Sequence, residues 1–198
     1  MKKQQLEMTL QQLRPLETRS EKLEQYSTPA NIAADVVWDA FTEGDIQDRS
    51  VADLGCGNGV LSIAAKLMGA SEVLGVDLDP GALKVASENA RTLGLDITLR
   101  EGDVLSVTGR FDTVLQNPPF GAQKKHADRA FIRKSLEIAP RVYSLHNAGT
   151  ETFVARMVES LGGRCRPVKR FKFEIPFSFE FHKKPKETFS MVLLKFEK

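Results

Sequence analysis

The sequence predicts an α/β fold in which a mostly parallel sheet is covered by helices on both faces and ends in an antiparallel hairpin. Three observations carry this prediction. Apolar runs of strand length alternate with segments of helical period between residues 50 and 163. A glycine-rich loop joins the first of these strands to a helix. The period then changes to two, because apolar residues, mostly phenylalanine, stand at alternate positions from Phe171 to Phe181.

Turn residues divide the chain into its expected elements. Residues 3–25 are expected to form one or two short helices, and Thr28 with Pro29 is expected to open the next helix as its N-cap and first position. Pro176 should bend the first strand of the hairpin. We then expect strands at 50–55, 71–79, 96–104, 110–117, 141–147, 171–181 and 188–197, with helices at 59–70, 80–94, 126–139 and 149–163.

The composition indicates one ordinary globular domain over residues 1–198. Charged residues make up 27% and hydrophobic residues 41% of the chain. The polar N-terminus argues against a signal peptide, and no apolar run has the length of a membrane span. Cys56 and Cys165 match no metal-ligand spacing, so we expect no metal site and a reducing, cytoplasmic compartment.

Charge is unevenly distributed. Residues 121–134 carry +4 and residues 164–186 carry +6, which leaves −8 for the rest because the whole chain carries +2. A basic minority on an acidic body is typical of a surface that faces a polyanion such as RNA. Solvated helix faces and turns would give the same pattern.

The glycine loop carries the first functional signal. Gly55, Gly57 and Gly59 follow a strand and enter a helix, where tight turns and close approach of a ligand require glycine. Asp77 ends the next strand, where it can accept hydrogen bonds from ribose hydroxyls. Asp103 ends the third strand, and its carboxylate with the backbone of Val104 can read an adenine edge. A nicotinamide-binding loop is an alternative for the glycines alone.

Asn117-Pro118-Pro119-Phe120 carries the second signal. Two prolines donate no ladder hydrogen bonds, so the fourth strand must stop there. The Asn117 side-chain oxygen and the Pro118 carbonyl can each accept one N–H of an aromatic amine and so hold its nitrogen in line for methyl transfer. Phe120 offers a face on which a flipped-out base can stack. The alternative is a rigid loop without catalytic function.

These motifs resemble those of class I methyltransferases, which bind S-adenosylmethionine across the carboxyl ends of a seven-stranded sheet. The Asn-Pro-Pro-Phe tetrad is similar to the signature of amino-methyltransferases that act on adenine N6, guanine N2 or protein glutamine. The stretches "EQYSTPANIAADVVW", "VYSLHN" and "FHKKPKE" make the chain resemble the methyltransferase-like protein 5 family and its archaeal relatives, which methylate N6 of one adenosine in small-subunit ribosomal RNA.

The resemblance implies roles for individual residues. It implies that the tetrad is catalytic and that residues 1–45 form a helical cap over the cofactor site. It assigns cofactor contacts to Gln25, Thr28, Gly55, Asn58, Val60, Asp77, Asp103 and Val104. Position and charge add RNA contacts at Lys124, Lys125, His146, His182, Lys183 and Lys184. After "YSLH" the family often carries a basic residue, where this chain has Asn147, so one phosphate contact is in doubt.

The resemblance also implies a partner. The third strand should lie at a sheet edge, which exposes unpaired backbone groups, and eukaryotic relatives bind a small zinc-containing activator protein that adds a strand at such an edge. A protein-glutamine methyltransferase and a non-catalytic RNA-binding module remain as alternative functions, as does a guanine-N2 methyltransferase. Phe120 and the short N-terminal region argue against the first, and the intact tetrad argues against the second.

Overall fold

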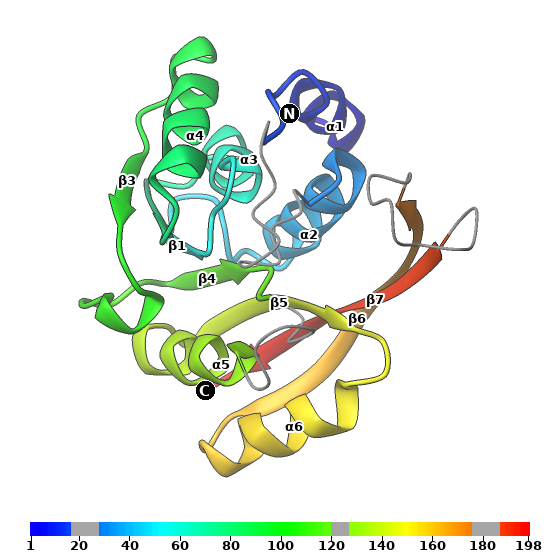
Figure 1. Cartoon of the computed structure of the whole chain (residues 1–198). Coiled ribbons are helices and arrows are strands. Elements are labelled where there is room, and N and C mark those ends of the chain that lie inside the picture. The colour runs from blue at the N-terminus through cyan, green and yellow to red at the C-terminus, as the bar shows by residue number, and fades with distance from the viewer. Residues whose placement is uncertain (17–27, 120–126, 176–186) are drawn as a thin grey trace.

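The computed structural model describes residues 1–16, 28–119, 127–175 and 187–198. Their strands form one seven-stranded sheet in the order β3-β2-β1-β4-β5-β7-β6 (Figure 1). The first five strands are parallel and β7 is antiparallel to both β5 and β6, which confirms the predicted fold. The strands are β1 Ser50–Leu54, β2 Glu72–Asp77, β3 Thr98–Glu101, β4 Thr113–Gln116, β5 Arg141–Asn147, β6 Arg164–Ile175 and β7 Glu187–Glu197.

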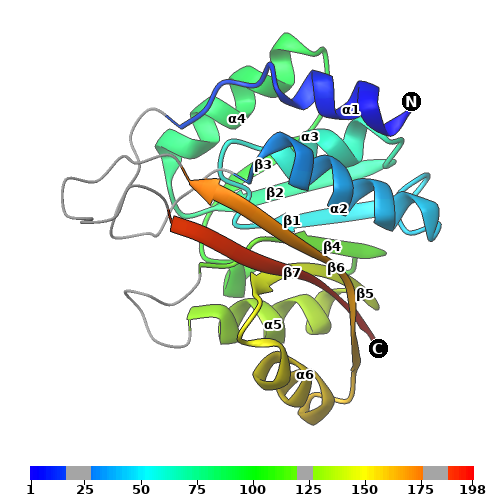
Figure 2. The ribbon, with the colours of Figure 1, turned by 90° about the vertical axis from the view of Figure 1, so that its right-hand side faces the viewer.

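Helices cover both faces of this sheet. In Figure 2, α1 to α4 lie on one side of the strands and α5 and α6 on the other. The helices are α1 Lys3–Leu10, α2 Ala30–Thr42, α3 Val60–Leu67, α4 Pro80–Thr92, α5 Ala127–Ile138 and α6 Glu151–Ser160, with a 3₁₀ turn, η2, at Val104–Ser106. None of the helices in these described ranges is long and apolar enough to cross a membrane.

Two hydrophobic clusters fill the spaces on either side of the sheet. Leu115 and Tyr143 face the α1–α3 side, whereas Val114 and Val142 face the α5–α6 side, because successive strand residues point to opposite faces. Strands buried on both faces read as continuous apolar runs, which explains why β1 and β4 were recognisable from the sequence.

Two local predictions were wrong. Helix α2 begins at Ala30 with Pro29 as its N-cap residue, so Thr28 lies outside the helix and does not cap it. Strand β6 begins at Arg164, well before the expected position 171. Pro167 lies within this strand, where a register shift between Pro167 and Lys169 accommodates it, and an edge strand tolerates a missing donor.

Candidate active site

The glycine loop forms the floor of the site at the carboxyl end of β1. Gly55, Gly57 and Gly59 have φ angles of 71°, 54° and 83°, values that L side chains rarely adopt. A Cβ at Gly55 would lie 3.1 Å from the Phe131 ring, and one at Gly59 would lie 3.0 Å from the Ala86 Cβ. A Cβ at Gly57 would meet nothing within 4 Å. Gly57 therefore borders open space that a ligand can enter.

Asp77 connects this loop to the end of β2. Its carboxylate accepts hydrogen bonds from the backbone N–H of Gly57 at 2.8 Å and of Asp79 at 3.0 Å. Burial raises the pKa of Asp77 above its ordinary value, although these N–H groups oppose the rise. A carboxylate has about four lone-pair positions, so Asp77 can still accept hydrogen bonds from ligand hydroxyls.

Asp103 stands exposed at the end of the next strand. One of its oxygens accepts the backbone N–H of Leu105 at 2.8 Å and so caps η2. Leu105 is 49% exposed, and Leu78, directly after Asp77, is 56% exposed. An exposed leucine thus follows each acid and offers apolar surface for a flat ring. The sequence analysis did not select these leucines, although an apolar residue after each strand-end acid was a visible signal.

Asp53 is a second residue that the sequence analysis did not assign. It is buried at the end of β1, where one carboxylate oxygen accepts the backbone N–H of Ser62 at 2.9 Å and its hydroxyl at 2.6 Å. The other oxygen is buried without a hydrogen-bond partner in the described residues. Burial raises the pKa of Asp53 to about 7, against the effect of Ser62. An unsatisfied buried acceptor beside the glycine loop suits an ammonium group or an ordered water.

Val60 is the first residue of α3, and Asn58 lies just before the N-cap Gly59 and faces the N-terminal segment. Its amide nitrogen donates to the Arg14 carbonyl at 3.1 Å. Asn89 of α4 donates to the same carbonyl at 3.2 Å and to the Asn58 carbonyl at 3.0 Å, and it accepts the Arg14 N–H at 2.9 Å. Val60 is buried. The side chain of Asn58 therefore anchors residue 14 to the glycine loop.

Asn117 lies at the carboxyl end of β4, as the sequence predicts. Its amide nitrogen donates to the Thr28 hydroxyl at 2.9 Å, which orients the amide oxygen away from Thr28. Thr28 is buried, and this contact is the role that the structure gives to its hydroxyl. Pro118 is buried and Pro119 half-buried, so the corner is held on both sides. An oriented amide oxygen at a rigid strand end can position the amine of a substrate.

A chain of buried polar side chains runs beneath this corner. The Gln116 amide nitrogen donates to the Ser144 hydroxyl at 3.0 Å, and that hydroxyl lies 2.6 Å from His146 Nε2. Burial lowers the pKa of His146 to about 4, so the ring is neutral near pH 7 and shares one hydrogen bond with the Ser144 hydroxyl, whose direction follows the tautomer of the ring. The Gln116 side-chain oxygen is buried without a partner in the described residues.

His146 was expected to contact RNA, and the structure places it elsewhere. Its side chain is 3% exposed and packs near Phe196, because residue 146 of β5 points into the α5–α6 side of the sheet. The ring is therefore not presented to a macromolecule at the surface. The remaining predicted contacts lie outside the described residues, namely Gln25, Phe120, Lys124, Lys125, His182, Lys183 and Lys184.

Several cations of the basic C-terminal stretch form ion pairs within the molecule. Arg166 contacts both carboxylate oxygens of Glu43 at 2.7 and 2.8 Å, and Lys169 lies 2.6 Å from Asp35. Arg170 pairs with Glu151. These three residues contribute to the +6 of residues 164–186, so less of that charge is available to a polyanion than the sequence suggests. No cluster of three or more His, Cys, Asp or Glu side chains suited to a metal occurs in the described ranges.

The fold and this site define a class I methyltransferase. The methyltransferase small domain matches residues 28–159 of the chain. Enzymes of this class use S-adenosylmethionine, and the open space at Gly57, the strand-end acids and the unsatisfied Asp53 oxygen fit such a cationic nucleoside.

Full-length relatives narrow the family. The chain is 39% identical to the protein MJ0284 of Methanocaldococcus jannaschii over 100% of its own length and 94% of that protein. It is 35% identical to the rRNA N(6)-adenosine-methyltransferase METTL5 of Danio rerio, covering 93% of each chain. A solved structure from Pyrococcus horikoshii, PH1948, which is described as a candidate RNA methyltransferase, superposes with a TM-score of 0.92 at 39% identity and covers 100% of this chain and 98% of its own. The chain therefore belongs to the methyltransferase small domain family, in the group that contains METTL5 and these archaeal proteins.

Proposed function

We propose that this chain transfers a methyl group from S-adenosylmethionine to the exocyclic N6 amine of an adenosine in small-subunit ribosomal RNA. The observation that carries the proposal is the orientation of Asn117 by Thr28 at the carboxyl end of β4. The full-length similarity to METTL5 proteins of fish and fly, which are rRNA N(6)-adenosine-methyltransferases, supports adenosine as the target.

The cofactor contacts follow from the site. Asp77 accepts from ribose hydroxyls, Asp103 and the Val104 backbone meet the adenine edge, and Leu78 and Leu105 flank its ring. The unpartnered oxygen of Asp53 accepts, directly or through water, from the amino group of the cofactor. Bound there, S-adenosylmethionine supplies a methyl group on a positively charged sulfur, which makes that carbon electrophilic.

The catalytic corner acts on the amine of the target base. The Asn117 side-chain oxygen and the Pro118 carbonyl each accept one N–H of this amine. These two hydrogen bonds fix the position of the nitrogen and keep its lone pair on the nitrogen, where it can attack, rather than delocalised into the ring. The nitrogen forms a bond to the methyl carbon as the sulfur–carbon bond breaks, and the sulfur keeps the electron pair. The methylated amine is then acidic and loses one proton to water, so no general base is required.

Residues 1–45 close the cofactor site in this proposal. Two contacts on either side of the undescribed residues 17–27 support the idea. Arg14 is held against the glycine loop by Asn58 and Asn89, and Thr28 is held against Asn117. The described residues on the two sides of this gap therefore lie beside the glycine loop and beside the catalytic corner, and a cofactor contact at Gln25 remains a prediction. Lys124, Lys125, His182, Lys183 and Lys184 remain predicted RNA contacts, and the two free cysteines suit the cytoplasm as its compartment.

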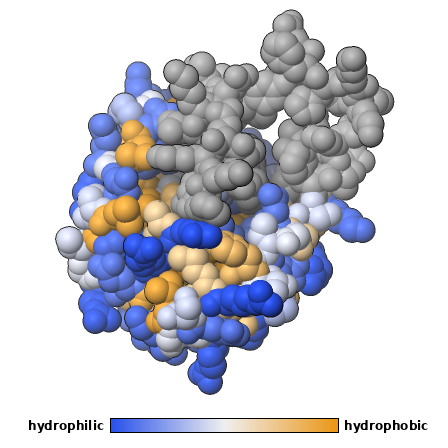
Figure 3. Space-filling view, turned by 60° about the horizontal axis from the view of Figure 1, so that its bottom comes forward, coloured by the Kyte–Doolittle hydropathy of each residue, from blue (hydrophilic) through white to orange (hydrophobic). Residues whose placement is uncertain are grey.

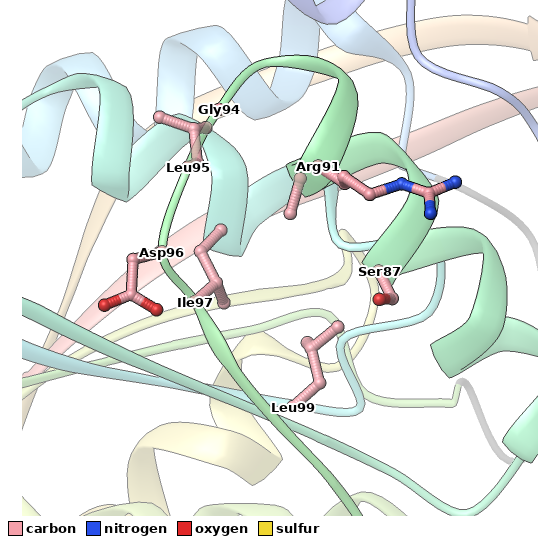
Figure 4. A pocket seen from close by; sticks show the side chains of 8 residues that line it. Ser87, Arg91, Gly94, Leu95, Asp96, Ile97 and Leu99 are labelled. Carbon is pink, nitrogen blue, oxygen red and sulfur yellow. The ribbon is translucent and has the colours of Figure 1, made fainter.

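We also propose that a small zinc-containing activator protein adds a strand to β3. In the described residues β3 pairs with β2 alone, so its other side offers backbone groups. A pocket of about 400 Å³ lies beside it, where Leu95, Ile97 and Leu99 line the strand side and Ser87 and Arg91 belong to α4 (Figure 4). If the lone protein is monodisperse and fully active, and a candidate activator changes neither its stability nor its rate, this partner is excluded.

The function is tested by incubating the protein and labelled S-adenosylmethionine with each of two acceptors, purified ribosomal RNA and ribosomal protein, and with buffer alone as the blank. We expect label in the RNA only. Label in the protein would support the glutamine-directed alternative, and absence of label from both with intact RNA binding would support the non-catalytic module.

A further inference from the structure

An exposed cation–π pair joins the first turns of α5 and α6. The Arg129 guanidinium carbon lies 5.2 Å from the centroid of the Phe153 ring. Phe153 is 37% exposed and Arg129 is also exposed. The pair contributes little to the core, since Val154 and Val158 are the residues that bury α6 against the sheet. A planar cation on an aromatic ring is therefore displayed at the surface.

The pair lies at the end of the sheet that holds the catalytic corner. Helix α5 starts at Ala127, shortly after the Asn117-Pro118-Pro119 corner, and α6 starts at Glu151, directly after the carboxyl end of β5. Strands β4 and β5 are parallel neighbours with Gln116 opposite Ser144, so their carboxyl ends lie together. Both first turns therefore border the site that we assign to the target base.

The surrounding surface combines apolar area with unpaired positive charge. Figure 3, which brings the α5–α6 side forward, shows an apolar patch bordered by strongly hydrophilic residues. Met157 and Leu161 are partly buried hydrophobic residues of this region, and Arg133 and Arg156 are exposed on the same two helices.

Two of the acids on these helices, Glu151 and Glu137, have other partners. Glu151 forms an ion pair with Arg170, and Glu137 forms one with Lys134 at 2.8 Å. Within the described residues no carboxylate pairs with Arg129, Arg133 or Arg156. The three arginines therefore differ from the paired cations of β6, although Asp128 and Glu159 on the same two helices offset part of their charge.

We propose that Arg129 and Phe153 form a stacking platform for a single-stranded RNA nucleotide next to the target adenosine, with Arg133 and Arg156 contacting its phosphates. This inference rests on the proposed RNA substrate. A base can stack on a guanidinium plane or a phenyl ring whatever its identity, and extruding one adenosine leaves its neighbour unstacked. An acidic protein would satisfy the arginines but would have no need of an exposed cation–π pair.

The test measures binding of a fluorescent single-stranded RNA oligonucleotide, and the KM for ribosomal RNA, with four variants. Phe153→Leu keeps apolar volume without the aromatic face, and Phe153→Tyr keeps that face. Arg129→Lys keeps the charge without the plane. Arg110→Ala is the matched control, because Arg110 is an exposed arginine on the chain segment that leads into the amino end of β4.

We expect Phe153→Leu to weaken RNA binding and to raise the KM for RNA by about tenfold, and Phe153→Tyr to bind like the unaltered protein. Arg129→Lys should weaken binding by a smaller factor, and Arg110→Ala should have little effect. The affinity for S-adenosylmethionine should not change in any of them. If Phe153→Leu and Arg129→Lys bind RNA as tightly as Arg110→Ala does, the platform does not exist. If the unaltered protein itself neither binds nor methylates RNA, the proposed function fails instead.

Discussion

Buried polar groups at the two ends of the central sheet differ in whether the protein itself supplies partners for all of their atoms. At the amino end, Lys195 is buried and contacts both Glu43 and Asp45, and Asp45 also accepts the Tyr143 hydroxyl at 2.7 Å and pairs with Arg141 at 2.8 Å. At the carboxyl end, Asp53 and Gln116 each keep a buried oxygen without a partner in the described residues, and two leucines are exposed. We interpret the partnered groups of the amino end as structural, and the Asp53 oxygen of the carboxyl end as a candidate ligand contact.

The direction of the pKa shifts supports this distinction. Burial alone would lower the pKa of Lys195, but hydrogen bonds to Asp45 and Glu43 outweigh it and raise that pKa, so the ammonium form is stabilised. Burial raises the pKa of Asp53 to about 7, and its one partner, Ser62, only partly offsets this. A charge that is compensated within the protein belongs to the structure, whereas an uncompensated one is available for binding.

The largest effect is expected at the compensated end. Asp45→Ala should lower the free energy of unfolding by about 3–5 kcal/mol, because it leaves the Lys195 ammonium buried with one fewer carboxylate. Urea unfolding measures this loss, and the affinity of the folded fraction for S-adenosylmethionine should be unchanged. A loss below about 1 kcal/mol would mean that the cluster contributes no more than a surface ion pair does.

Asn117→Ala tests the opposite end. We expect turnover to fall by about two orders of magnitude or more, because the variant loses the acceptor that positions the target amine. Cofactor affinity, measured by calorimetry, should stay within about twofold, since Asn117 acts on the amine. Near-normal methylation would show that Asn117 is not the catalytic acceptor.

Asp77→Asn should weaken binding of S-adenosylmethionine by about ten- to a hundredfold, because the charge-assisted acceptor for the ribose is lost while one amide oxygen remains for the Gly57 N–H. Calorimetry on the folded variant measures the change. Asp79→Asn is the matched control at the neighbouring acid, and equal losses in both variants would count against a specific ribose contact.

His146 gives a smaller, pH-dependent effect. Its pKa is about 4 in the folded protein and 6.5 in the unfolded chain, so only the unfolded chain takes up a proton between these values. The stability is therefore fully present above pH 6.5 and falls as the pH falls towards 4, by about 2 kcal/mol at pH 5. Urea unfolding at pH 7.5 and pH 5 should show this loss, and His146→Gln should remove it. The same loss in both proteins would assign it to other groups.

The sequence predicted the elements whose pattern is local and missed the features that depend on pairing. The glycine loop, the strand-end acids and the Asn117 corner were recognisable because turns and strand ends depend on residues that are adjacent in the chain. The sequence does not show whether Arg166 is free or bound to Glu43, since the two residues lie far apart in the chain and meet only in the fold. His146 was placed at the surface for a similar reason, because its burial depends on the α5–α6 layer that covers this face of β5, and the neighbouring residues in the chain do not show that cover.

The most direct test of the account is nucleoside analysis of ribosomal RNA after reaction with S-adenosylmethionine and either the unaltered protein or Asn117→Ala. The account predicts that N6-methyladenosine appears with the unaltered protein, at close to one per RNA molecule, and is nearly absent with the variant. Formation of N2-methylguanosine, or equal N6-methyladenosine with both proteins, would contradict the assignment of adenine N6 to the Asn117 corner.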